Sequence, residues 1–179
     1  MNLTDKTIKE LQTKDIFVDI YTDNFDESLY GFIKDYNDDF LLLEHYNEDG
    51  FYNGIIIFRR QDITRVKWDN NNINSTFKLI TRQIAEELND IKIDSIEVIL
   101  KTVDKTFKHV NLHIQEINSD WSIIGQIKDI DKDTIVIKEF GTMTSLDRGM
   151  IMISISDITR IDAGGLYENN LMKILGINN

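Results

Sequence analysis

The stretch GFIKDYNDDFLLLE at residues 31–44 decides the fold, because the chain repeats its design as GQIKDIDKDTIVIK at residues 125–138. Five positions are identical at a spacing of 94 residues: Gly31 and Gly125, Ile33 and Ile127, Lys34 and Lys128, Asp35 and Asp129, Asp39 and Asp133. A repeat of this kind predicts two copies of one structural unit in tandem.

The repeat extends in both directions from this stretch. Upstream, at the same spacing, the alternating apolar residues of one copy fall on those of the other: Ile16, Val18 and Ile20 on Val110, Leu112 and Ile114. Downstream the spacing is 95 residues, and the tetrapeptide DITR occurs at 62–65 and again at 157–160. The extra residue falls in a turn, where insertions are tolerated. We interpret DITR as an architectural element of the last strand.

Alternation of apolar and polar residues, interrupted by turn-forming residues, predicts five strands in each copy. The predicted strands are 15–22, 28–36, 40–46, 51–59 and 62–67, then 108–116, 121–130, 134–140, 147–154 and 157–162. Short turns rich in Asp, Asn and Gly join them, which predicts antiparallel meanders. Helical patterns at 4–14, 75–90, 94–107 and 166–175 flank the two meanders. The sequence therefore predicts a mainly β protein with flanking helices, in two domains at 1–90 and 91–179.

A five-stranded meander after a helix, with a glycine in the second strand, resembles the Sm/LSm family. The first half of that family's signature is met by six residues of the first copy: Gly31, Ile33, Tyr36, Asn37, Phe40 and Leu43. The second copy matches less closely. A glycine suits a strand that bends sharply, since no side chain obstructs the neighbouring strand. The resemblance implies two tandem Sm-like five-stranded small β-barrels, each preceded and followed by a helix.

The resemblance also implies a candidate RNA-binding site. Its residues would be Tyr36, Asn37, Phe40, Arg59 and Arg60. The sequence departs from the family where the base pocket forms. At the asparagine position of the signature, the first copy has leucine and the second has isoleucine. At the position of its Arg-Gly pair, the first copy has Arg-Arg and the second has Ser-Ile. These departures weaken the implication of RNA binding.

Composition and motifs exclude several chemistries. The chain has no cysteine, so it forms no disulfide or thiolate metal site, and its net charge of −11 opposes binding to DNA or anionic lipid. It has no window of apolar residues long enough to span a membrane and no secretory signal pattern. None of the usual nucleophile, phosphate-binding or dinucleotide motifs occurs. We expect a cytoplasmic protein that is not an enzyme and uses no cofactor.

Two patterns suggest metal ligands without completing a site. The turns at 35–39 and 129–133 carry three oxygen-bearing side chains at calcium-loop spacing, but Phe40 and Thr134 replace the glycine that the EF-hand loop requires. His109 and His113 share one face of a predicted strand, with no third ligand in evidence. We therefore predict no metal site.

Three functions stay open at this point. The leading prediction is a non-enzymatic Sm-like protein acting in protein binding or assembly. The alternatives are an RNA-binding protein with a diverged Sm-type pocket, and an acidic inhibitor or immunity protein that masks a basic partner. The apolar segment MIMISI at 150–155 would leave an exposed strand edge, and such edges tend to be paired or covered. This predicts either self-association or a protein partner at these edges, or their burial under the closing helices at 75–90 and 166–175.

Overall fold

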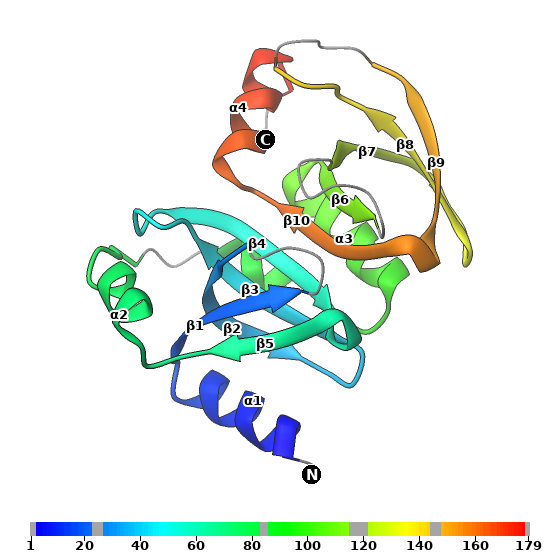
Figure 1. Ribbon diagram of the computed structural model, residues 1–179. Helices are drawn as coiled ribbons and strands as arrows, with labels where there is room; N and C mark the ends of the chain where they lie inside the picture. Colours follow the sequence, from blue (N-terminus) through cyan, green and yellow to red (C-terminus); the bar gives the residue numbers. More distant parts are fainter. Residues whose placement is uncertain (1–2, 23–26, 83–85, 115–121, 144–147, 178–179) are drawn as a thin grey trace. The chain divides into compact units, whose positions relative to one another are not determined.

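The computed structural model describes residues 3–22, 27–82, 86–114, 122–143 and 148–177. The chain divides into two compact units, Met1–Ala85 and Glu86–Asn179. Both are mainly β with flanking helices, as predicted (Figure 1).

Unit 1 contains an N-terminal helix, five strands and a short closing helix. In chain order these are α1 (Leu3–Thr13), β1 (Phe17–Thr22), β2 (Leu29–Tyr36), β3 (Phe40–Tyr46), β4 (Tyr52–Arg59), the 3₁₀ turn η1 (Arg60–Asp62), β5 (Ile63–Lys67) and α2 (Asn71–Phe77). All five predicted strands are confirmed to within two residues at each end.

Unit 2 repeats this plan. In chain order its elements are η2 (Glu86–Asp90), α3 (Ile96–Phe107), β6 (Val110–Ile114), β7 (Ile123–Ile130), β8 (Thr134–Glu139), β9 (Met150–Ser154), η3 (Ile155–Asp157), β10 (Ile158–Ala163) and α4 (Leu166–Ile174). Parts of three predicted strands, at 115–116, 121 and 147, lie outside the described residues. No helix in the described part of the chain is both long and apolar enough to cross a membrane.

The strand order is the same in both units, β5-β1-β2-β3-β4 and β10-β6-β7-β8-β9, and the pairing within each unit is antiparallel. The expectation of closed barrels is wrong, because within the described residues the two end strands of neither five-strand order pair with each other. The three-residue turns η1 and η3 send the last strand back to the far side of the first strand. The result is a bent but open sheet in each unit.

Matching irregularities bend the two sheets at the same places. A β-bulge lies between Ile33 and Asp35 in β2, and another lies between Ile127 and Asp129 in β7. Two residues before each bulge stands a glycine. A Cβ on Gly31 would lie 2.2 Å from the carbonyl oxygen of Glu44 on β3, and one on Gly125 would lie 2.3 Å from the carbonyl oxygen of Lys138 on β8. Only glycine allows so close an approach of two strands.

The predicted alignment of the first strands is wrong by two residues. Val18 pairs with Gly31, and Val110 pairs with Gly125, so Val18 is equivalent to Val110 and not to Leu112. A slip of two residues keeps the same side chains on the same face, so alternation alone could not detect it. The true spacing in this strand is 92 residues.

The repeated DITR segment forms the same β-bulge in both units. In β5, Ile63 and Arg65 have partners on β1 while Thr64 is passed over; in β10, Thr159 is passed over in the same way. The hydroxyl of Thr64 donates to the carbonyl oxygen of Tyr21 at 3.3 Å, and that of Thr159 donates to the carbonyl of His113 at 3.2 Å. The threonine thus holds the bulge to the first strand.

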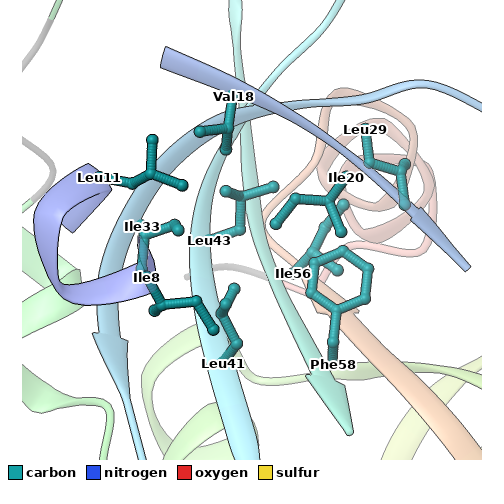
Figure 2. Close-up of a cluster of buried hydrophobic side chains, with 10 residues drawn as sticks. All are labelled: Ile8, Leu11, Val18, Ile20, Leu29, Ile33, Leu41, Leu43, Ile56 and Phe58. Carbon is teal, nitrogen blue, oxygen red and sulfur yellow. The ribbon is translucent and has the colours of Figure 1, made fainter. Parts of the chain in front are cut away.

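One apolar cluster fills the concave side of unit 1 and joins α1 to the sheet. Figure 2 shows Ile8 and Leu11 of α1 among strand side chains. The cluster comprises Ile8, Leu11, Val18, Ile20, Leu29, Ile33, Leu41, Leu43, Ile56 and Phe58, all buried. Burying each such side chain contributes about 1.5–3 kcal/mol, so this cluster is a main source of stability in unit 1.

The predicted helix at 75–90 is wrong in position. Helix α2 begins earlier, because the Asn70 side chain caps it by accepting from the amide of Ile73 at 3.0 Å, and it ends at Phe77. Residues 78–82 are not helical, and 83–85 lie outside the described residues. Arg82 forms ion pairs with Asp15 and with Glu44, which hold this extended segment against the sheet.

Candidate functional site

The structure brings the five residues of the predicted RNA site together at one corner of unit 1. Tyr36 ends β2, Asn37 lies in the following turn and Phe40 begins β3, while Arg59 ends β4 and Arg60 begins η1. Phe40 and Arg59 are direct partners in the β3–β4 ladder. RNA binding by this corner stays a prediction.

Arg60 has a structural role at this corner. Its guanidinium donates to the carbonyl oxygen of Asn37 at 2.6 Å, forms an ion pair with Asp5 of α1 at 2.7 Å, and lies 5.9 Å from the centre of the Tyr36 ring. Its backbone amide donates to the carbonyl of Asp39 at 2.8 Å. Arg60 therefore ties α1 to the turn, and contact with a nucleotide would have to compete with these bonds.

The two acidic turns fold as Asx turns. The Asn37 side-chain oxygen accepts from the amides of Asp39 and Phe40, both at 2.8 Å. Asp131 accepts from the equivalent amides of unit 2 at 2.9 and 2.7 Å, and these two bonds lower the pKa of its carboxyl. One side-chain oxygen of Asn37 and one of Asp131 are thus engaged by the backbone of the turn itself. Within the described ranges no cluster of three or more His, Asp or Glu side chains could hold a metal.

The two histidines of unit 2 have separate surroundings. His109 is buried, and its Nδ1 donates to the carbonyl of Phe107 at 2.8 Å while its Nε2 accepts from the amide of Gly164 at 3.3 Å. Burial lowers the pKa of its imidazole. His113 instead lies 3.0 Å from Asp162 and 3.0 Å from the guanidinium of Arg160. Both imidazoles are held by protein groups, which fits a structural role.

Sequence reasoning missed a groove of about 730 Å³ in unit 1 between α1, η1 and β5. Its lining combines apolar side chains at the base with polar groups around them. The lining residues are Thr4, Asp5, Thr7, Ile8, Leu11, Asp38, Arg60, Gln61, Ile63, Thr64, Arg65 and Val66. No motif marks it, because its two walls are nearly sixty residues apart in the chain. It runs beside β5, a strand whose one neighbour within unit 1 is β1.

The segment singled out as an apolar edge forms β9, which pairs with β8 alone among the described strands. Backbone bonds at both ends of β9 fix which of its residues bond to β8. The amide of Glu139 donates to the carbonyl of Gly149 at 3.0 Å, and the amide of Ile155 donates to the carbonyl of Asp133 at 2.9 Å. In an antiparallel ladder, bonded residues alternate. The backbone groups of Met150 and Met152 therefore point away from β8.

The side chains of this edge are also exposed and uncharged. Met150 is 61% exposed and Met152 is 74% exposed, while Ile153 on the other face is buried. Natural edge strands usually carry lysine, proline or a bulge that discourages pairing. The five residues of β9 have no such protection.

No protein-family model, no curated protein and no solved structure matches this chain. The function must therefore be argued from the two open edges, the groove and the corner site.

Proposed function

We propose that this protein is a non-enzymatic, Sm-like assembly protein that binds a second copy of itself by adding strands at β9. The observation that carries the proposal is the pair of exposed methionines on an edge strand whose outward backbone groups have no partner among the described residues. Strand addition of this kind takes its affinity from main-chain hydrogen bonds and its specificity from alternate side chains.

The acceptor that fits β9 is the β5 edge of the other copy. β5 pairs with β1 in its own unit, and the groove beside it is lined by the half-buried apolar side chains of Ile63 and Val66. Methionine side chains are flexible and polarisable, so they adapt to grooves of irregular shape. An incoming strand could bond to β5 while Met150 and Met152 enter the groove.

The Sm-like assignment of each unit is part of the same proposal. It is supported by the bent meander, the glycine in the second strand, the preceding helix and the short turn before the fifth strand. The family joins neighbouring units through the fourth strand of one and the fifth of the next. β9 is the fourth strand of unit 2, and β5 is the fifth of unit 1.

Light scattering coupled to size exclusion tests the proposal. Wild-type protein at tens of micromolar should have a mass above that of the 20.9 kDa chain. Met152→Lys places a charge on the edge without removing a β8 bond, and it should return the protein to monomer. Phe51→Lys is the matched control, since Phe51 is 69% exposed but lies in a turn outside the strands, and it should leave the mass unchanged.

A monomeric wild-type protein over this concentration range would contradict the proposal. So would an unchanged oligomer in Met152→Lys, because strand addition at β9 cannot tolerate a buried, unpaired lysine.

A further inference from the structure

The closing helices of the two units differ at one buried position. Helix α2 is capped by Asn70 and α4 by Gly165, and three residues into each helix stand Ile73 and Glu168. Ile73 is 1% exposed, within an aromatic cluster, and Glu168 is 7% exposed. The same place in the same fold thus takes an apolar side chain in unit 1 and a carboxyl group in unit 2. The fold itself does not require a carboxyl there.

The carboxyl of Glu168 has one side-chain partner among the described residues. Its Oε1 accepts from the Nδ2 of Asn111 on β6 at 2.7 Å. The other side-chain atom of the same amide, Oδ1 of Asn111, is buried and accepts no hydrogen bond within the described part of the chain. An ionised carboxylate can only accept, so it cannot satisfy that oxygen. A protonated carboxyl can, because its O–H donates to Oδ1 while its C=O accepts from Nδ2.

The burial of Glu168 also favours the protonated form of its carboxyl. Burial is the main cause that raises the pKa of Glu168, and the charge of Asp162 on β10 raises it further. The bond from Asn111, the helix's own amide and the nearby His113 act in the opposite direction. Arg160, the remaining charged group of this region on β10, already contacts Asp162 and His113, each at 3.0 Å.

Helix α4 covers an apolar cluster of unit 2. Leu171 and Met172 of α4 are buried against Ile124 of β7 and Phe140 after β8. Ionising Glu168 would leave a buried charge beside Asp162 and a buried amide oxygen without a donor. Either cost is relieved if the first turn of α4 moves out to water.

We propose that Glu168 and Asn111 form a protonation-dependent latch, which holds α4 on unit 2 while the carboxyl is protonated and releases the helix when it ionises. The direction of the pH dependence follows from the linkage between proton binding and helix docking. A carboxyl that binds its proton more tightly in the docked state favours docking at low pH, and docking weakens as pH rises from the ordinary pKa of 4.5 to the raised value. The docking constant falls by up to about tenfold per pH unit in that window and is constant above it.

Hydrogen exchange followed by mass spectrometry tests the latch in the full chain. Protection of peptides covering residues 166–175, corrected for intrinsic exchange, is measured across the acid to neutral range. Wild-type α4 should lose protection with rising pH. Glu168→Gln copies the protonated group, since its amide can accept from Nδ2 and donate to Oδ1 of Asn111, and it should retain the protection throughout. Glu97→Gln makes the same change in the exposed first turn of α3 and should behave as wild type.

Two further measurements keep the test decisive. Glu168→Ile copies unit 1 and should also remove the pH dependence, should the glutamine variant fail to fold. A ¹³C titration of the glutamate carboxyls, assigned by the resonance missing in either variant, should give Glu168 a pKa above 4.5. Protection of wild-type α4 that does not change with pH would overturn the latch. An ordinary or lowered pKa for Glu168 would overturn it as well.

Discussion

Replacing Gly31 by alanine tests what bends the sheet of unit 1. The added Cβ would lie 2.2 Å from the carbonyl oxygen of Glu44 and 2.7 Å from a side-chain carbon of Leu43. Cβ atoms essentially never come closer than 3.0 Å to such an atom, and ordinary van der Waals contact begins at 3.4 Å. The obstruction is backbone, so it cannot rotate away, and β2 and β3 must separate. Gly125→Ala should meet the equivalent obstruction in unit 2, since its Cβ would lie 2.3 Å from the carbonyl of Lys138.

The expected loss of stability in Gly31→Ala follows from two opposing effects. Overpacking of this severity costs about 3 kcal/mol, at the upper end of the usual range. Alanine also restricts the unfolded chain, which offsets this cost by about 0.4–1 kcal/mol. The free energy of unfolding should therefore fall by about 2 kcal/mol, and with a urea dependence of about 2 kcal/mol per molar the unfolding midpoint should fall by about 1 M.

Urea unfolding followed by circular dichroism provides the measurement, with Gly149→Ala as the control. A Cβ on Gly149 meets nothing within 4 Å, so this variant should be as stable as wild type or slightly more so. Equal stability of Gly31→Ala and Gly149→Ala would refute the argument that the close approach of two strands requires glycine.

Four further outcomes are expected. Thr64→Val and Thr159→Val should each lower the free energy of unfolding by about 1 kcal/mol, measured by heat or urea, because each removes the hydroxyl that holds a DITR bulge. Unequal losses of stability in the two variants would contradict equivalent roles for the two threonines. Glu44→Gln should lower the free energy of unfolding by about 2–3 kcal/mol, because the buried carboxylate bonds Lys34, Arg82 and Tyr46. The loss is limited because Lys34 and Arg82 can partly regain contact with water. An unchanged melting temperature would contradict this. Burial lowers the pKa of His109 below its ordinary 6.5, so the free energy of unfolding should fall as the pH drops through 6.5. His109→Phe copies Phe17 of unit 1, and its melting temperature should not show this dependence on pH. Melting curves in chelator and in millimolar calcium should coincide, because Asn37 and Asp131 each use a side-chain oxygen to accept from backbone amides within the turn; a rise of several degrees with calcium would show a site.

The strands could be predicted from the sequence because their signals are local. Alternation marks the buried face, and Asx-forming residues such as Asn37 and Asp131 mark the turns, so the bounds of β3 at Phe40–Tyr46 agree with the prediction. The alignment of the first strands could not be predicted, since pairing partners are set across the sheet by Gly31 and Gly125. The helix predicted at 75–90 is wrong in position, because the stripe of apolar residues gave no sign that Asn70 caps a helix ending at Phe77.

The candidate site was only partly accessible to the same reasoning. The sequence indicated β9 as an apolar edge, since MIMIS carries no charge. It could not indicate the groove beside β5, whose walls meet only in the folded unit. Nor could it assign Arg60 to a structural role, because its partner Asp5 lies 55 residues away. Side chains that act through long-range contacts need the fold before their role can be read.

The two units keep one backbone while differing in what lies beneath the closing helix. In unit 1 that layer contains Phe17 and Ile73. In unit 2 the strand register places His109 at the position of Phe17, and the helix N-caps place Glu168 at the position of Ile73. Glycines, bulges and Asx turns therefore specify the sheet, whereas this layer specifies how firmly the closing helix is held. Apolar packing holds α2 with little dependence on pH. In unit 2, burial raises the pKa of Glu168 and lowers that of His109, so these two groups make its stability respond to protonation in opposite directions, and the two units can respond differently to the same change of pH.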